Sequence, residues 1–234
     1  MKNCIITGAS RGMGEAIAIK LASQGYSLGL CARSIDDLTQ LKAKLVAVQL
    51  NSNQSFFIKS VDVRDKYQVQ NFANDCLTKF EHIDVIINNV GTYLPGFSLL
   101  ESDIQFETQI DINLKAAYYL TKILVPRMIE KQSGHIFNIC SVASQDVVVE
   151  AGSYSVTKAS LLSLNHVWRK ELASKGIKVT ALLPGATFTS SWEGSSVNEM
   201  DLVQAQDIAD SISAILQLSK NSNVDELRIS PLNF

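Results

Sequence analysis

The chain has 234 residues, of which 46% are hydrophobic and 19% charged, and its formal net charge is −2. A chain of this length and apolar content can bury a core of its own, so we expect one folded domain over residues 1–234 and exclude a disordered or collagen-like protein. The near-neutral charge argues against nucleic acid as a partner, because binding to phosphates requires a basic surface. No membrane partner is expected either.

The four cysteines lie far apart in the chain: Cys4, Cys31, Cys76 and Cys140. They form no C-x-x-C pair and have no clustered histidines beside them, which fits neither a zinc site nor a disulfide framework. No apolar run reaches the ~18 residues of a transmembrane helix. The first ten residues enter a strand pattern at once, without room for a signal peptide. We therefore expect a cytoplasmic protein without a metal site.

Short apolar runs alternate with longer stretches of helical period along the chain. The apolar runs predict seven strands, several of them buried on both faces: Asn3–Thr7, Ser27–Ala32, Phe56–Val61, Asp84–Asn88, His135–Cys140, Lys178–Leu183 and Leu227–Ile229. The longer stretches predict helices: Gly12–Ser23, Ile35–Leu50, Lys66–Phe80, Ile104–Lys131, Tyr154–Lys175 and Ala205–Leu218. This alternation predicts an α/β fold of the Rossmann type, a doubly wound parallel sheet of about seven strands with helices on both faces, in three layers.

One long stretch, Gly185–Asp201, fits neither pattern and is rich in Ser, Gly and Asn. In an open α/β sheet, ligands bind beyond the carboxyl ends of the strands. Because this stretch follows the sixth strand, we expect the segment 185–205 to form a lid over the substrate. An ordinary surface loop is the alternative.

A glycine-rich turn joins the first strand to the first helix. Residues 7–14 read TGASRGMG, with the spacing G-x-x-x-G-x-G instead of the more common G-x-G-x-x-G. Glycines let the backbone approach a pyrophosphate closely, and the N-terminus of the following helix stabilises its charge. In the first turn of a doubly wound pattern, this sequence favours a dinucleotide site.

The end of the second strand indicates which dinucleotide binds. An NAD site usually has an acid here, whereas this chain has Ala32 and then Arg33. Arg33 can form a forked, charge-assisted contact with a 2′-phosphate, and Arg11 in the glycine turn can flank the same group. The alternative is that Arg33 is a solvated charge ahead of a helix. The missing acid and the two arginines favour NADP(H) over NAD(H).

A tyrosine and a lysine four residues apart, Tyr154 and Lys158, share one face of a predicted helix. A free tyrosine has a pKa near ~10, which a nearby positive charge lowers towards the neutral range where proton transfer is efficient. The pattern Y-x-x-x-K is weak by itself. Ser141 strengthens it, because this serine ends the fifth predicted strand and can reach Tyr154 at the carboxyl edge of the sheet.

Together these features resemble the short-chain dehydrogenase/reductase family, single-domain type, over nearly the whole chain. Each motif is modest, but their order and spacing are specific. Asn88-Asn89-Val90-Gly91 resembles the family's Asn-Asn-Ala-Gly segment, with Val90 in place of alanine. Pro184-Gly185 with Thr189 resembles its Pro-Gly-x-x-x-Thr segment, which lies along the nicotinamide.

The resemblance implies an oxidoreductase that transfers a hydride between NADP(H) and a carbonyl or secondary alcohol. It implies that Tyr154 donates or accepts the proton and that Ser141 hydrogen-bonds the substrate oxygen. Lys158 is implied to lower the pKa of the tyrosine and to bind the nicotinamide ribose. Asn113 completes the family's catalytic tetrad and is implied to anchor a water of a proton relay.

The resemblance, together with the glycine turn and the arginines, also assigns a set of cofactor contacts, with Asp62 against the adenine. The full set is Gly8, Ser10, Arg11, Gly12, Met13, Gly14, Arg33, Asp62, Val63, Asn89, Gly91, Tyr154, Lys158, Pro184, Gly185, Thr187 and Thr189. In the family, the helices that carry Asn113 and Tyr154 form the subunit contact. The resemblance therefore implies a homodimer or homotetramer.

Two alternatives to this enzyme stay open: an NAD-linked alcohol dehydrogenase of the same family, and a non-catalytic nucleotide-binding module. The complete tetrad favours an enzyme. The motifs do not identify the substrate, although residues beyond the strand ends suggest a partly apolar carbonyl compound: Tyr93, Leu94, Val142, Ser144, Val147, Phe188 and Trp192. The three histidines, His82, His135 and His166, lack partners typical of a metal site or a triad and are expected to be structural.

Overall fold

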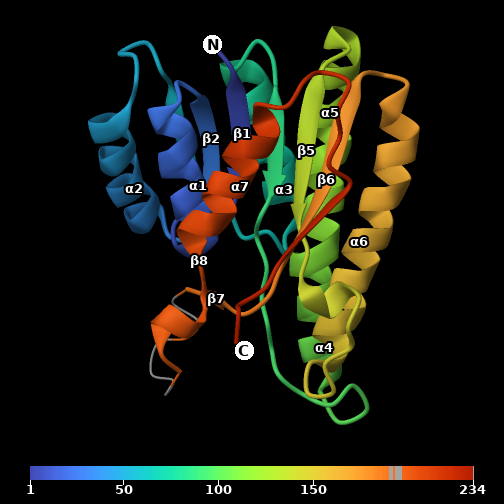
Figure 1. Cartoon of the computed structure of the whole chain (residues 1–234). Coiled ribbons are helices and arrows are strands. Elements are labelled where there is room, and N and C mark those ends of the chain that lie inside the picture. Colours follow the sequence, from blue (N-terminus) through green and yellow to red (C-terminus); the bar gives the residue numbers. More distant parts are fainter. Residues whose placement is uncertain (190–191, 193–196, 234) are drawn as a thin grey trace.

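Seven parallel strands form the central sheet of the computed structural model, which describes residues 1–189, 192 and 197–233 (Figure 1). The strand order is β3-β2-β1-β4-β5-β6-β9. The strands are β1 (Asn3–Thr7), β2 (Ser27–Ala32), β3 (Phe56–Ser60), β4 (Val85–Asn88), β5 (Gly134–Ile139), β6 (Ile177–Pro184) and β9 (Glu226–Ile229). The predicted doubly wound, Rossmann-type sheet is confirmed, and the order reverses between β1 and β4.

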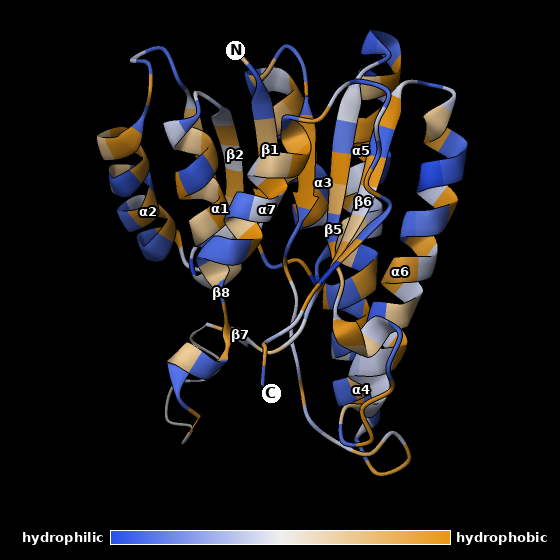
Figure 2. Cartoon of the chain, in the orientation of Figure 1, coloured by the Kyte–Doolittle hydropathy of each residue, from blue (hydrophilic) through white to orange (hydrophobic). Residues whose placement is uncertain are grey.

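Helices cover both faces of the sheet, as the alternating sequence pattern predicts. They are α1 (Gly12–Ser23), α2 (Ile35–Val48), α3 (Lys66–Lys79), α4 (Asp103–Ile110), α5 (Ala116–Lys131), α6 (Gly152–Ala173) and α7 (Ala205–Leu216). One apolar cluster joins α1, α2 and α7 to the sheet, and a second joins α3, α5 and α6 to its other face. Apolar residues accordingly line the inner faces of the layers in Figure 2.

The core explains why the strand sequences are so continuously apolar. Every residue of β2 is buried, because helices cover the sheet on both sides. Fully buried side chains such as Leu21 of α1 and Phe72 of α3 fill the two clusters. All four cysteines are buried and free. Within residues 1–189, 192 and 197–233, no helix combines the length and hydropathy needed to cross a bilayer.

The predicted helix Ile104–Lys131 is wrong in one detail. A π-helical turn, Asp111–Lys115, separates α4 from α5. The chain keeps its direction through this turn, so the apolar pattern on either side resembles that of one long helix. The turn contains Asn113, one of the predicted site residues.

The predicted lid, segment 185–205, begins where β6 ends. Its residues 190–191 and 193–196 lie outside the described residues. In the described part, two-residue strands β7 (Thr187–Phe188) and β8 (Val203–Gln204) pair in parallel below the main sheet (Figure 1). Sequence reasoning missed both strands, because two residues are too few to show a period. The lid function stays a prediction.

Candidate active site

The carboxyl ends of the central strands meet at the lower edge of the sheet in Figure 1. Here the neighbouring strands β1 and β4 lead into helices on opposite faces, which opens the crevice where ligands bind in this kind of fold. Asn89, directly after β4, spans the crevice. Its Nδ2 donates hydrogen bonds to the carbonyl oxygens of Thr7 and Gly8, at 2.8 and 3.0 Å. The Asn-Asn-Val-Gly segment is therefore fixed against the glycine turn.

The glycine turn requires its glycines for steric reasons. Gly8 and Gly12 have φ of 63° and 57°, a region that disfavours other residues. A Cβ on Gly14 would lie 2.2 Å from the Gly8 carbonyl oxygen. Helix α1 then begins without a side-chain cap, whereas α2, α3 and α4 each have one. The first N–H groups of α1 can thus bind an anion.

The segment after β6 lies beside the same turn. A Cβ on Gly12 would be 3.0 Å from Cγ2 of Thr189. The Thr187 hydroxyl donates to the Gly185 carbonyl at 2.9 Å, and the Gly185 N–H donates to the Ile229 carbonyl of β9 at 2.7 Å. The structure therefore brings the predicted Pro-Gly-x-x-x-Thr segment and the predicted phosphate turn together.

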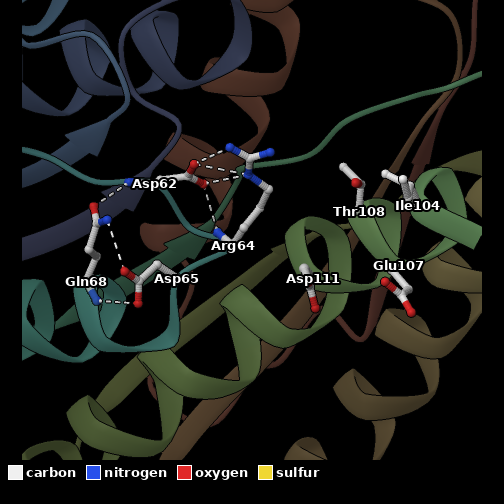
Figure 3. A pocket seen from close by; sticks show the side chains of 8 residues that line it. All are labelled: Asp62, Arg64, Asp65, Gln68, Ile104, Glu107, Thr108 and Asp111. Atoms are coloured by element: carbon white, nitrogen blue, oxygen red, sulfur yellow. Dashed lines mark hydrogen bonds and ion pairs between the residues drawn. The ribbon is translucent and has the colours of Figure 1, made fainter.

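The opposite end of the crevice carries Arg33 and Asp62. Arg33 is exposed after β2, and its carbonyl oxygen accepts a 2.7 Å hydrogen bond from the Ser60 hydroxyl at the end of β3. Asp62 lies two residues after Ser60 and lines an open pocket of about 490 Å³ (Figure 3). Val63 beside it is buried.

Sequence reasoning missed Arg64, which binds Asp62. Its Nε lies 3.0 Å from both carboxylate oxygens of Asp62 (Figure 3). This hydrogen bond, with a smaller contribution from Arg33, holds the pKa of Asp62 below its ordinary value. The spacing Asp-x-Arg directly after a strand was the available signal, since a two-residue offset lets the side chain fold back on the carboxylate.

The three predicted catalytic side chains around α6 lie close together. Ser141 follows β5 and caps the short 3-10 helix Val142–Ser144, its Oγ accepting from the Ala143 N–H at 3.1 Å. Lys158 is buried, and its Nζ is 5.9 Å from the ring centre of Tyr154. The same Nζ donates a 2.7 Å hydrogen bond to the Ile139 carbonyl at the end of β5.

Burial is the largest cause of the pKa shifts of Tyr154 and Lys158. It raises the pKa of Tyr154 above its ordinary value, and a hydrogen bond with Ser141 offsets this rise in part. Burial also lowers the pKa of Lys158 to about 8. The causes of the Tyr154 shift are burial, the hydrogen bond with Ser141 and the charge of Cys140, so the expected effect of Lys158 on the pKa of the tyrosine stays a prediction. The phenol is therefore protonated at neutral pH.

Asn113, the fourth predicted catalytic residue, binds the backbone of the loop after β4. Its Oδ1 accepts from the Thr92 N–H at 2.8 Å, and its Nδ2 donates to the Thr92 carbonyl at 2.9 Å and to Thr157 Oγ1 at 3.0 Å. A Cβ on Gly91 would be 3.4 Å from Asn113 Oδ1 and 3.3 Å from Lys158 Nζ. Asn113 and Lys158 thus flank the same glycine.

Two further amides continue this arrangement at four-residue intervals, and sequence reasoning missed both. Gln109 is fully buried; its Oε1 accepts from the Leu94 N–H at 3.2 Å, and its Nε2 donates to Ser153 Oγ at 2.5 Å. Gln105 Nε2 donates to the Pro95 carbonyl at 2.9 Å. We call Gln105, Gln109 and Asn113 the amide ladder. Gln109 and Asn113 fix the loop after β4 to the first two turns of α6, through Ser153 and Thr157.

The fixed loop places one predicted pocket residue against the tyrosine. The ring of Tyr93 packs edge-on against that of Tyr154, with centroids 5.1 Å apart and an interplanar angle of 82°. Of the other predicted pocket residues, Ser144 accepts a 3.2 Å hydrogen bond at Oγ from the Ser141 N–H, whereas Val147 is 81% exposed.

The histidines make ordinary structural contacts. His135 is buried, and its Nε2 lies 2.8 Å from Thr180 Oγ1 on the neighbouring strand. His166 Nε2 lies 2.7 Å from the Glu226 carboxylate. Within the described ranges, no three His, Cys, Asp or Glu side chains are grouped so that they could hold a metal ion.

Comparison with known proteins identifies the family. The model of the short chain dehydrogenase family matches residues 2–199. The chain belongs to this family. Among the short-chain dehydrogenases and their relatives, uncharacterized oxidoreductases of Staphylococcus epidermidis and Staphylococcus aureus are 33% and 32% identical over 231 residues, covering 99% of this chain and 97% of each relative.

Solved structures of short-chain dehydrogenases share the fold over the whole chain. The alcohol dehydrogenase of the archaeon Thermococcus sibiricus, complexed with 5-hydroxy-NADP, superposes with a TM-score of 0.90 at 28% identity, covering 100% of this chain and 98% of that one. A metagenomic short-chain oxidoreductase in complex with NADP gives 0.83 at 28% identity, covering 97% and 96%.

Proposed function

We propose that this short-chain dehydrogenase is an NADP(H)-dependent oxidoreductase that acts on a carbonyl or secondary alcohol substrate, with Tyr154 as the general acid and base. The observation that carries the proposal is the grouping of Tyr154 with Ser141 and Lys158 at the carboxyl edge of the sheet. The cofactor supplies or accepts the hydride when bound. The chain itself supplies the proton and the stabilisation of charge.

Proton transfer is the role we assign to Tyr154. Burial keeps its phenol protonated at neutral pH, so the residue is ready to donate to the oxygen of a carbonyl that becomes an alkoxide. Its partly exposed ring lies against Tyr93 at the mouth of the crevice, where a substrate can reach it.

The other three members of the tetrad bind the substrate, the cofactor and a water molecule next to Tyr154. Ser141 donates a hydrogen bond to the substrate oxygen and stabilises the charge that develops on it. Lys158 holds a hydroxyl of the nicotinamide ribose, and its fixed Nζ is oriented for this by the bond to Ile139. Asn113, beside Lys158 at Gly91, anchors the water through which protons reach the site.

The cofactor site that we propose fits the residues present. The uncapped start of α1 and the left-handed glycines receive the pyrophosphate. The complete set of proposed contacts is Gly8, Ser10, Arg11, Gly12, Met13, Gly14, Arg33, Asp62, Val63, Asn89, Gly91, Tyr154, Lys158, Pro184, Gly185, Thr187 and Thr189.

Two observations support NADP(H) over NAD(H). The chain has Ala32 and Arg33 where an acid would bind the ribose of NAD, and Arg33 is exposed and able to meet a phosphate. The two related structures at 28% identity bind NADP or 5-hydroxy-NADP. The cofactor would thus be recognised by its 2′-phosphate.

We further propose that the enzyme is a homodimer or homotetramer of the cytoplasm. A groove between α5 and α6 has an apolar floor that includes Val125, Ile129 and Trp168, with charges of both signs at its rim. A second copy of the chain can fill it around a twofold axis with opposite charges paired. The four free, buried thiols fit a reducing compartment.

Fluorescence titration of the purified protein with NADPH and with NADH tests the cofactor assignment. Tighter binding of NADPH is expected. Tighter binding of NADH would favour an NAD-linked alcohol dehydrogenase, and binding of neither would contradict the proposed enzyme. A panel of ketones and aldehydes then identifies substrates that are turned over.

The variant Tyr154→Phe tests the chemistry. The phenylalanine keeps the ring packing but removes the proton, so kcat is expected to fall by about 10²–10⁴-fold, whereas NADPH affinity should fall far less because Tyr154 is one of many proposed cofactor contacts. Tyr67→Phe, which alters a tyrosine that is 74% exposed on α3, is the matched control. A Tyr154→Phe enzyme as active as this control would rule out the mechanism.

A further inference from the structure

The carboxylate of Asp62 is nearly saturated with hydrogen-bond donors, all of them from Arg64. Its Oδ1 accepts from the backbone N–H and from Nε of Arg64, each at 3.0 Å. Its Oδ2 accepts from Nε at 3.0 Å and from Nη2. Figure 3 shows the guanidinium folded back over the carboxylate. Such a forked contact cancels the charge of Asp62 more completely than a single-point ion pair.

The register of β2 and β3 brings this ion pair close to Arg33. Ala32 pairs with Ser60, and the Val61 N–H donates to the Ala32 carbonyl at 2.8 Å. Arg33 and Asp62 therefore leave the sheet side by side, and the charge of Arg33 contributes to the lowered pKa of Asp62. A carboxylate in this position competes with a phosphate for Arg33 and repels it.

Other carboxylates line the same pocket, and Arg64 is the only cation among its eight described lining residues. Asp65 accepts hydrogen bonds from the N–H groups at the start of α3. Asp111 pairs with Lys115 at 2.7 Å, outside the lining set. Glu107 lies on α4, across the pocket from Arg64 (Figure 3). Arg64 is thus the group that neutralises Asp62.

We propose that Arg64 determines the cofactor selectivity of this enzyme: by pairing with Asp62, it removes the negative charge beside Arg33 and so permits the 2′-phosphate of NADP(H) to bind there. The proposal rests on the proposed function, in particular on Arg33 as the reader of the phosphate. Arg64 acts through Asp62 and need not touch the cofactor. Without it, the unpaired carboxylate of Asp62 would repel a phosphate bound at Arg33.

A double-mutant cycle tests this role. Dissociation constants for NADPH and NADH are measured by fluorescence for the wild type, Arg64→Gln, Asp62→Asn and the double variant. Both cofactors have the same adenine, so the ratio of the two constants isolates the effect on the phosphate. Arg64→Gln is expected to lower the preference for NADPH by about three- to ten-fold, and the added Asp62→Asn to restore it.

Salt and a matched arginine provide the controls. The repulsion between Asp62 and the 2′-phosphate acts between exposed charges. The loss of NADPH preference in Arg64→Gln should therefore shrink as ionic strength rises from about 0.02 M to about 0.5 M. Arg127→Gln removes an exposed arginine that pairs with Glu130 on α5 and should leave the ratio unchanged. Circular dichroism verifies that each variant is folded.

Three results separate the proposal from its alternatives. An unchanged ratio in Arg64→Gln would overturn the role of Arg64. A double variant that discriminates as poorly as Arg64→Gln would overturn it as well, since Arg64 would then contact the phosphate directly. Equal affinity of the wild type for NADPH and NADH would instead contradict the cofactor assignment of the proposed function.

Discussion

Lys158 donates a hydrogen bond from Nζ to the carbonyl oxygen of Ile139, 2.7 Å away, and thereby joins the second turn of α6 to the end of β5. The bond fixes an ammonium group in a fully buried position. Burial of a charge costs free energy, which is why the pKa of Lys158 falls to about 8. The residue needed for activity is therefore expected to weaken the fold.

Lys158→Met should consequently raise stability while abolishing turnover. The unfolded chain binds a proton at Lys158 up to a pH near ~10.4, whereas the folded chain releases it near pH 8, so the penalty is largest at or below pH 8 and disappears as the pH rises through this window. After subtraction of the lost hydrogen bond, the free energy of unfolding of the variant should exceed that of the wild type by on the order of 1–2 kcal/mol at pH 7. Urea unfolding of both proteins at pH 7 and pH 10.5 measures the difference. A gain independent of pH would contradict this account.

Gly91→Ala should impair catalysis without unfolding the protein. The new methyl group would lie 3.3 Å from Lys158 Nζ, which must shift by a few tenths of an ångström, and would contact Asn113 Oδ1 at 3.4 Å. We expect kcat to fall about tenfold, since small displacements of catalytic groups have large effects. Gly96→Ala is the control, because its methyl group would meet only the end of the Gln105 side chain at 3.2 Å and the Glu101 Cβ at 3.6 Å. Steady-state kinetics that rank the two variants equally would argue against the prediction.

Gln109→Met tests how much the buried amide of the amide ladder contributes to stability and activity. The methionine fills the space but leaves the Leu94 N–H without its acceptor, at a cost of about 1–3 kcal/mol in the free energy of unfolding, while the Ser153 hydroxyl keeps its hydrogen bond to Glu101. Since Ser153 precedes Tyr154, kcat should fall as well. Gln105→Met, at a half-buried position of the same ladder, should cost less than about 1 kcal/mol. Urea titrations of the two variants, with kinetics, test whether the buried amide is the stronger contact.

Replacing Ala32 with Asp and Arg33 with Ile should move the cofactor preference towards NADH. The aspartate offers acceptors to the ribose hydroxyls, and loss of the arginine removes charge-assisted contacts with the 2′-phosphate. Affinity for NADPH is expected to fall by about 10- to 100-fold, equivalent to about 1.5–3 kcal/mol. The measurement is kcat/KM with each cofactor. An unmoved preference would mean that Arg33 does not read the phosphate.

Most of the fold can be predicted from the sequence, because strands buried on both faces have continuous apolar runs and helices keep their period. β2 begins and ends as predicted, Ser27–Ala32, since all its residues are buried. The pair of β7 and β8 could not be found this way, and neither could the π-helical turn. Both depend on contacts with distant parts of the chain, which a local pattern does not encode.

In the candidate site, too, features encoded by local patterns can be predicted and features that depend on packing cannot. The sequence indicates Tyr154, Ser141 and Lys158, because their spacing places them at one edge of the sheet. It does not indicate that Lys158 binds the Ile139 carbonyl or that burial raises the pKa of Tyr154, since both follow from the packed environment. Gln109 could not be found from the sequence because its partners, Leu94 and Ser153, lie 15 and 44 positions away in the chain, whereas Arg64 was missed although its partner Asp62 is only two positions away.

The π-helical turn holds one residue more than the α-helical turn that it replaces. Deleting one residue within it would restore regular α-helical winding and leave the flanking residues facing much as before, Gln109 towards the loop after β4 and Leu120 towards the core. Asn113 lies inside the turn and would lose its present position. A single-codon deletion there should therefore spare the fold but reduce activity, whereas a deletion in the exposed turn at residues 50–53 should affect neither.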